Sequence, residues 1–179
     1  MPQPYRNTSD VKIRWNPLSK RPRIAQLIAE ALAAYAMADA MLANILGKVL
    51  EVDEQIGLEV YLALKAEGPA KLIFDLLVKP RISTEAYASL SALRDEIKSV
   101  SGWRNDFAHG VYAIADDEPD NILIVKPADS ARYFAVRFNS MGRTPPPMQA
   151  LVYTEKEIDE YRTRVSELAE NVFRFGRGL

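Results

Sequence analysis

The sequence contains no cysteine and only one histidine, His109, among its 179 residues. The missing cysteines exclude disulfides, thiolate metal sites and thiol catalysis. A single imidazole also excludes a site built from several histidines of one chain. No loop concentrates acidic residues at the spacing that calcium or magnesium ligands require. We therefore expect neither a bound metal nor a cofactor.

A strong net charge is missing as well, since the formal net charge is -1 and the sequence pI is about 5.9. A protein that coats nucleic acid would carry a large basic excess, but an enzyme that acts on RNA needs only a local basic patch. The chain starts with Met1-Pro2-Gln3-Pro4 and a polar stretch rather than with a signal peptide. No apolar stretch is expected to span a bilayer. We expect a cytoplasmic protein with no membrane partner.

Residues 1–23 form a first segment with scattered prolines and little hydrophobic periodicity. Its charged side chains are mostly basic, and Arg6, Lys12, Arg14, Lys20, Arg21 and Arg23 are offset only by Asp10. We interpret this segment as a basic N-terminal arm. Such an arm is either a solvated tail or a segment that lies on a partner chain or on an RNA backbone.

Three stretches show the periodicity of long amphipathic helices. The first has apolar residues at alternating steps of four and three, namely Ile24, Ile28, Ala31, Tyr35, Ala38, Leu42, Ile45 and Val49. The second follows the N-capping residue types Ser83 and Thr84 and comprises Leu90, Leu93, Ile97 and Val100. The third follows a Thr154–Glu157 capping box and comprises Ile158, Tyr161, Val165, Leu168, Val172 and Phe175. Residues 52–66 predict a further, shorter helix.

Between Gly110 and the last helix the sequence becomes rich in β-forming residues. Residues 121–126 and 133–138 are two such runs, and in the second Phe134, Val136 and Phe138 share one face by alternation. Residues 149–153 predict a third strand. The expected fold class is therefore mainly α. We expect a single domain over 24–179, a bundle of about four main helices with a small antiparallel β insertion at about 121–153.

The segment Trp103–Gly110 carries the candidate site residues. Arg104 continues the apolar stripe of its helix, although a guanidinium is not fully buried without partners. Asn105 and His109 are four residues apart and lie one above the other on a helix. Arg104 and His109 are five apart, about 140° around an ideal helix. We therefore expect these two to diverge within one chain, and to meet only across a symmetry axis or through a backbone deviation at a flanking glycine.

The order Arg104-Asn105-Asp106-Phe107-Ala108-His109, followed by Gly110, resembles the signature of HEPN domains (higher eukaryotes and prokaryotes nucleotide-binding). That signature is an arginine, a polar residue that is usually asparagine, and a histidine four to six residues after the arginine. The resemblance implies a small helical bundle and, for many members, a metal-independent RNase of toxin–antitoxin or phage-defence systems. It also implies a composite active site in a homodimer, with Arg104, Asn105 and His109 as catalytic residues. RNA is then the substrate, and an antitoxin-like protein is a partner.

The residue types suit cleavage of RNA through its own 2′-hydroxyl. One group must deprotonate that hydroxyl, another must protonate the leaving 5′-oxygen, and a cation must stabilise the charge on the phosphate. Histidine suits either proton transfer near neutral pH, and arginine binds phosphate oxygens through two N–H groups. A chain with one histidine supplies two imidazoles only as a dimer. Trp103 and Tyr112 are the candidate substrate-binding residues, since Tyr112 is close enough to line the same cleft.

Other interpretations of the same residues stay open at this point. His109 is alternatively a helix-end histidine bonded to a carbonyl, with Arg104 paired to Asp95 or Glu96. Trp103 suits a core or an interface as well as base stacking. The competing functions are a non-catalytic HEPN-like helical dimer that binds a nucleotide or a protein, and an acid–base enzyme acting on a small phosphorylated molecule.

Overall fold

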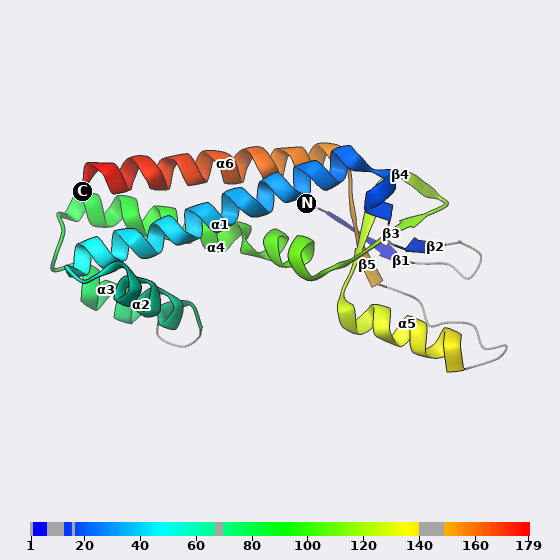
Figure 1. Cartoon of the computed structure of the whole chain (residues 1–179), viewed down its shortest axis with the longest axis horizontal. Helices are drawn as coiled ribbons and strands as arrows, with labels where there is room; N and C mark the ends of the chain where they lie inside the picture. The colour runs from blue at the N-terminus through cyan, green and yellow to red at the C-terminus, as the bar shows by residue number, and fades with distance from the viewer. Residues whose placement is uncertain (1, 7–12, 16, 67–69, 140–148) are drawn as a thin grey trace. The chain divides into compact units, whose positions relative to one another are not determined.

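The computed structural model describes residues 2–6, 13–15, 17–66, 70–139 and 149–179. This part of the chain is mainly helical, with six α-helices and one five-stranded antiparallel sheet (Figure 1). The prediction of a mainly α fold class is confirmed. The sheet is larger than the expected insertion, because strands from the start of the chain belong to it.

The elements have the following bounds. The helices are α1 (Pro22–Leu50), α2 (Glu54–Ala66), α3 (Ala70–Val78), α4 (Thr84–His109), α5 (Pro127–Asn139) and α6 (Glu155–Gly178). The strands are β1 (Gln3–Arg6), β2 (Ile13–Trp15), β3 (Val111–Ala115), β4 (Glu118–Val125) and β5 (Gln149–Tyr153). A short 3-10 helix, η1 (Pro17–Lys20), precedes α1.

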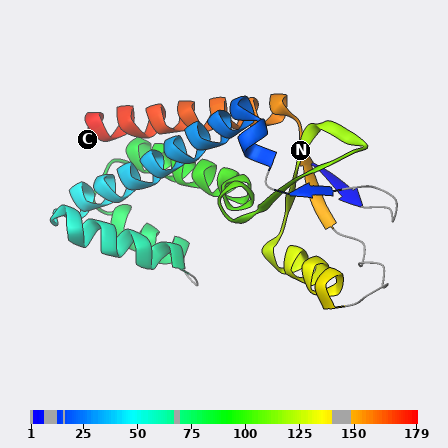
Figure 2. The ribbon, with the colours of Figure 1, turned by 45° about the vertical axis from the view of Figure 1, so that its right-hand side comes forward.

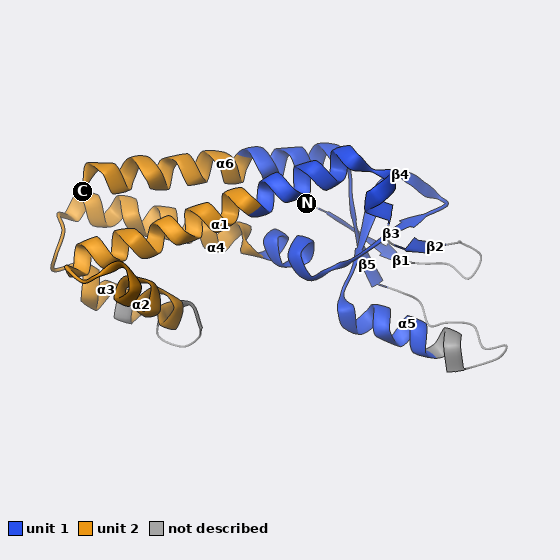
Figure 3. Cartoon of the chain, viewed as in Figure 1, with its two compact units in different colours: residues 1–32, 102–163 blue, residues 33–101, 164–179 orange. Residues whose placement is uncertain are grey.

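The chain divides into two compact units (Figure 3). Unit 1 comprises residues 1–32 and 102–163, and unit 2 comprises residues 33–101 and 164–179. The helices α1, α4 and α6 contribute residues to both units. Unit 1 holds the sheet, α5 and the whole segment Trp103–Gly110, so the candidate site lies within one unit.

The three long helices form where the sequence predicts them. The expected stripe of α1, from Ile24 to Val49, is buried. The helix α4 begins after Ser83, whose Oγ accepts a hydrogen bond from the amide of Ala86 at 3.1 Å. At the start of α6, Thr154 Oγ1 accepts from the Glu157 amide and the Glu157 carboxylate accepts from the Thr154 amide, both at 3.1 Å. This is the predicted capping box.

The helix α1 corrects the expectation that no stretch could span a bilayer. Among the described residues it is the one helix long and apolar enough, by length and composition, to cross a membrane. The core helix of a globular protein and a signal sequence near the N-terminus pass the same test. In α1, 33% of the apolar window is buried, and the stripe from Ile24 to Val49 belongs to the buried part.

The sheet of unit 1 has the strand order β1-β5-β4-β3-β2, and each neighbouring pair is antiparallel (Figure 2). In the β3–β4 pair Tyr112 is opposite Ile124, and on the other side of β4 Ile124 is opposite Leu151. Alternation places the side chain of Ile124 on one face of β4 and those of Leu123 and Val125 on the other. The central strand β4 therefore lies between β3 and β5 and pairs with both.

Residues 133–138 are helical, so the strand predicted there is wrong. They belong to α5, which begins at Pro127, a position where the missing N–H of proline costs little. The first turn closes when the amide of Ser130 donates to the carbonyl of Lys126 at 3.0 Å. The helix-start signals at Lys126-Pro127 outweigh the alternating pattern that follows them.

The aromatic residues of α5 pack against the sheet, and such residues are typical of strands as well. Tyr133 and Phe134 both contact Trp15 of β2, with ring centroids 5.5 and 4.7 Å apart. Tyr133 also belongs to the buried cluster that includes Leu123 and Val125 on this face of the sheet. Apolar residues in a short run fit a helix packed on a sheet as well as a strand, and periodicity alone does not separate the two. The side chains of residues 136 and 138 lie outside the described part.

The N-terminal segment differs from the expected basic arm, because residues 3–6 and 13–15 are the edge strands β1 and β2. Its side chains also contact the acidic stretch 116–120. The Tyr5 hydroxyl donates to Asp117 at 2.9 Å, Arg14 donates to Asp116 at 2.6 Å, and Arg21 donates to the Asp120 carbonyl at 3.2 Å. The basic charge of this segment thus complements acidic charge within unit 1. Residues 1, 7–12 and 16 lie outside the described part.

Unit 2 is helical and is built from α2, α3 and parts of α1, α4 and α6. The helices α1 and α2 approach closely at two glycines, since a Cβ on Gly57 would lie 2.7 Å from the Cα of Gly47. The same two helices are joined by a hydrogen bond from Tyr61 to Asp39 at 2.5 Å. Burial and this bond raise the pKa of Tyr61. Residues 67–69, between α2 and α3, lie outside the described part.

Candidate functional site

The candidate residues lie on the last two turns of α4, which is helical without interruption through Gly102 to His109 (Figure 1). The helix end has an inner and an outer side. Phe107 is buried and Trp103 is half-buried, whereas Asn105 and His109 are exposed. The inner residues fix the helix end, and the outer residues are available to a ligand.

Arg104 contacts both other residues of the motif. Its Nη1 lies 3.1 Å from Asn105 Oδ1 and 3.1 Å from His109 Nε2. Arg104 itself is half-buried. A guanidinium, an amide and an imidazole therefore meet at the exposed end of α4.

This convergence corrects the expectation that Arg104 and His109 diverge within one chain. The separation of about 140° describes where the two side chains leave a regular helix, but not how far they reach. Helix side chains lean toward the N-terminus, so the imidazole of His109 extends back over the preceding turn. The long arginine side chain crosses the remaining distance, and the two groups meet at 3.1 Å.

The contact assigns a role to each nitrogen of the imidazole. A guanidinium has only N–H donors, so Nε2 of His109 accepts the hydrogen bond from Arg104. The proton of the neutral ring then lies on Nδ1. The pair thus combines a proton acceptor with a permanent cation beside it.

The inner side of the helix end is held by aromatic rings. Trp103 stacks on Tyr161 of α6, with centroids 5.0 Å apart and an interplanar angle of 22°. Phe107 lies 5.1 Å from Tyr153 of β5 and 5.3 Å from Tyr161. Each such pair contributes about 0.5–1.5 kcal/mol beyond the burial of its surface. Trp103 therefore helps to fix the helix, and its role in substrate binding stays a prediction.

A hydrogen bond from Tyr153 to Asp106 is a second anchor, and sequence reasoning missed it. The Tyr153 hydroxyl donates to Asp106 Oδ2 at 2.8 Å and joins β5 to α4. Burial and then this bond raise the pKa of Tyr153, so the phenol keeps its proton. The sequence pattern indicates only a hydrophobic staple between Tyr153 and Ile158, and such a staple does not predict a partner for the hydroxyl.

Tyr112 caps the helix that carries the motif. Its hydroxyl donates to the carbonyl of Phe107, which is one of the last carbonyls of α4 and has no partner within the helix. Burial raises the pKa of Tyr112 to about 12. The predicted role of Tyr112 in substrate binding stays a prediction, and in this structure its hydroxyl serves the backbone.

Gly110 turns the chain from α4 into β3. Its amide donates to the carbonyl of Asp106 at 2.8 Å. A Cβ on Gly110 would lie 2.1 Å from Ile124 Cγ2 and 2.4 Å from the Asp106 carbonyl oxygen. Only glycine permits so close an approach, and the approach places the residue after His109 directly against β4.

Asp95 and Glu96, the acids named above as alternative partners of Arg104, belong to unit 2. Glu96 pairs with Arg164 at 3.6 Å in unit 2, and the side chain of Asp95 is exposed. Within the described ranges, no group of three His, Asp or Glu side chains could hold a metal ion.

Comparisons with protein-family models, with curated proteins and with solved structures find no match for this chain.

We predict opposite effects of one substitution at the two glycines that flank the motif. Gly102→Ala should stabilise the fold by about 0.5–1 kcal/mol, because Gly102 is in mid-helix and an added Cβ meets nothing within 4 Å. Gly110→Ala should destabilise it by about 1–3 kcal/mol, because the added Cβ overlaps Ile124. Urea titrations followed by circular dichroism measure both changes. A Gly110→Ala variant as stable as the parent would contradict the close approach.

We also predict that the neutral imidazole of His109 carries its proton on Nδ1. Because the chain has one histidine, its nitrogen spectrum contains a single imidazole that needs no assignment. Arg104→Leu should shift the population toward the tautomer with the proton on Nε2. Arg174→Leu is the control, since Arg174 pairs with Glu170 in unit 2. A tautomer that is unchanged in Arg104→Leu would argue against the contact in solution.

Proposed function

We propose that this chain is a metal-independent RNA endonuclease of the HEPN type. The observation that carries the proposal is the 3.1 Å contact between Arg104 Nη1 and His109 Nε2 at the exposed end of α4. It places a proton acceptor beside a group that binds phosphate oxygens. The HEPN assignment itself rests on the resemblance of the segment Arg104–His109, and the mainly helical fold agrees with it.

The proposed reaction needs no group from outside the protein and the RNA. When the RNA binds, Arg104 turns from Nε2 of His109 to the phosphate. The freed Nε2 of one His109 takes the proton of the 2′-hydroxyl, and the 2′-oxygen attacks the adjacent phosphorus. The bond from phosphorus to the 5′-oxygen breaks, and an imidazolium gives its proton to that oxygen. Arg104 donates to the non-bridging oxygens and stabilises their charge, while Asn105 positions the guanidinium. The products end in a 2′,3′-cyclic phosphate and a 5′-hydroxyl.

A second copy of the chain completes the proposed site. Removing one proton and delivering another require two groups, and each chain has one histidine. A twofold homodimer presents the same surface from each protomer, so two exposed His109 side chains can face one phosphate. Because Arg104 and His109 already meet within one chain, the second copy supplies the other proton-transfer group rather than assembling the arginine–histidine pair.

The biological setting is part of the same proposal. A HEPN-type RNase is expected in the cytoplasm, in a toxin–antitoxin or phage-defence system. Such an enzyme damages the RNA of its own cell unless it is held inactive. An antitoxin-like protein that covers the exposed end of α4 is therefore the partner we propose.

A second candidate function is a non-catalytic helical dimer that binds a protein or a nucleotide. One observation favours it, because α2 and α3 expose large apolar side chains. Leu58, Leu62, Leu72 and Leu76 are between 43% and 66% exposed. In each helix the two leucines are four residues apart and share one face. Exposed apolar faces of this kind are typical of protein interfaces.

Replacing His109 by alanine tests the nuclease proposal. The rate of RNA cleavage should fall at least about 100-fold in this variant, because a general acid or base contributes a factor of that size. The assay uses structured RNA in buffer with EDTA, and the ends of the products are identified by phosphatase and kinase treatment. Arg104→Ala should lose activity as well, whereas Arg174→Ala should retain it. Unchanged cleavage by His109→Ala, or no cleavage by the parent at high concentration, would refute the proposal and favour the binding function.

Mixing the parent with His109→Ala tests the second copy. The two forms are unfolded together and refolded so that subunits exchange, and the total protein is held constant. If both imidazoles are required, an equal mixture keeps about a quarter of the parent activity, because only dimers of two intact chains act. A linear fall to about half would mean that one chain is sufficient. Light scattering on the same samples reports whether dimers are present.

A further inference from the structure

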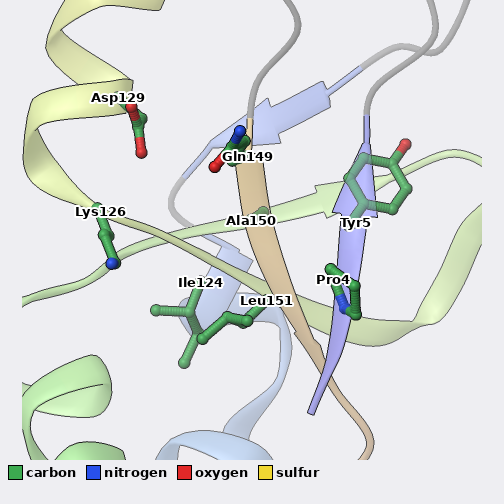
Figure 4. Close-up of a pocket in the computed structure, with 8 residues that line it drawn as sticks. All are labelled: Pro4, Tyr5, Ile124, Lys126, Asp129, Gln149, Ala150 and Leu151. Atoms are coloured by element: carbon green, nitrogen blue, oxygen red, sulfur yellow. The ribbon is translucent and has the colours of Figure 1, made fainter.

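A cavity of about 260 Å³ lies in unit 1 (Figure 4). Its apolar wall includes Ile124 of β4, Leu151 of β5 and Pro4 of β1. Lys126 and Asp129, at the start of α5, line the cavity on another side. The cavity therefore combines a flat apolar surface, supplied by three strands, with charged groups at one rim.

The cavity and the motif share one side chain. Ile124 lines the cavity, and its Cγ2 is the atom that a Cβ on Gly110 would meet at 2.1 Å. Gly110 directly follows His109, and Tyr112 is opposite Ile124 in the sheet. The strand β3, which follows Gly110, and Leu151 in the cavity wall are two strand spacings apart, about 10 Å.

The size and lining of the cavity indicate its ligand. Pockets that hold drug-sized molecules have volumes of about 300–1,000 Å³, so this cavity suits a group as small as one nucleobase. Proteins that recognise single-stranded RNA seat unstacked bases against apolar surfaces and bond to their edges. We infer that this cavity binds one base of the RNA, next to the phosphate held by Arg104 and His109. The inference rests on the proposed function and adds sequence preference to it.

The charged rim favours guanine over the other bases. The Asp129 carboxylate only accepts hydrogen bonds, and the Watson–Crick edge of guanine presents two neighbouring donors, N1–H and the N2 amino group. Adenine, cytosine and uracil each present fewer donors on that edge. Lys126 is exposed and suits another phosphate of the bound RNA. The ion pair of Asp129 with Arg132 is long, at 3.9 Å, and leaves the carboxylate able to bond to a base.

Titration with the four ribonucleoside 3′-monophosphates tests this inference without RNA cleavage. Guanosine monophosphate should bind about tenfold more tightly than the others, as expected for one additional charged hydrogen bond. Calorimetry gives the affinities, and the amide signals of Ile124 and Leu151 report where the nucleotide binds. Asp129→Asn should remove the preference for guanine. Asp120→Asn is the matched control, because Asp120 is an exposed acid on the same strand as Ile124 but at the other end.

A second variant fills the cavity instead of changing its charge. Leu151→Phe should abolish nucleotide binding while leaving the signal of His109 and the circular dichroism spectrum unchanged. Equal affinities for all four nucleotides, or signals that shift away from Ile124 and Leu151, would overturn the inference. Failure here is distinguishable from failure of the nuclease proposal. RNA cleavage without nucleotide binding would refute only the base cavity, whereas guanine binding without cleavage would refute only the nuclease.

Discussion

The close approach of Gly110 to Ile124 is the contact on which the rest of unit 1 depends. The end of α4 can approach the Ile124 side chain this closely only because glycine has no Cβ. The approach ends α4 at His109 and starts β3 at Val111. It also sets the register that brings the Tyr112 hydroxyl to the carbonyl of Phe107. The motif is thereby attached to the sheet at a fixed position.

Helix geometry places the anchoring residues and the exposed residues on different sides of the end of α4. Residues three and four apart share a side of a helix, which here carries Trp103, Asp106 and Phe107. The rings of Trp103 and Phe107 contact the ring of Tyr153, and Trp103 also stacks on Tyr161. Asp106 accepts a hydrogen bond from the Tyr153 hydroxyl. The opposite side presents Asn105 and His109 to solvent. The helix end is thus held in place, while these two side chains remain accessible. Arg104 joins the two sides, being half-buried and in contact with His109.

The sequence predicted the local structure where one signal dominates. Long stripes with three-four periodicity, N-caps and the Thr154–Glu157 box depend on residues close in the chain, and α1, α4 and α6 form as expected. Prediction failed where the deciding partner is remote. The run at 133–138 is helical and packs on Trp15, which is more than a hundred positions earlier. The N-terminal strands pair with β5 and β3, and Arg14 of β2 forms an ion pair with Asp116.

By itself the sequence determined which residues can carry chemistry, because residue types and spacing are its direct content. It singled out Arg104, Asn105 and His109, and because it holds one histidine, the RNA cleavage that we propose calls for a second copy of the chain. Only the tertiary structure decided that Arg104 and His109 meet within one chain. That outcome depends on where α4 ends and how its side chains lean, since an ideal helix separates the two residues by about 140°. Gly110, which directly follows α4, lies against Ile124, a residue of another element that the local sequence cannot specify.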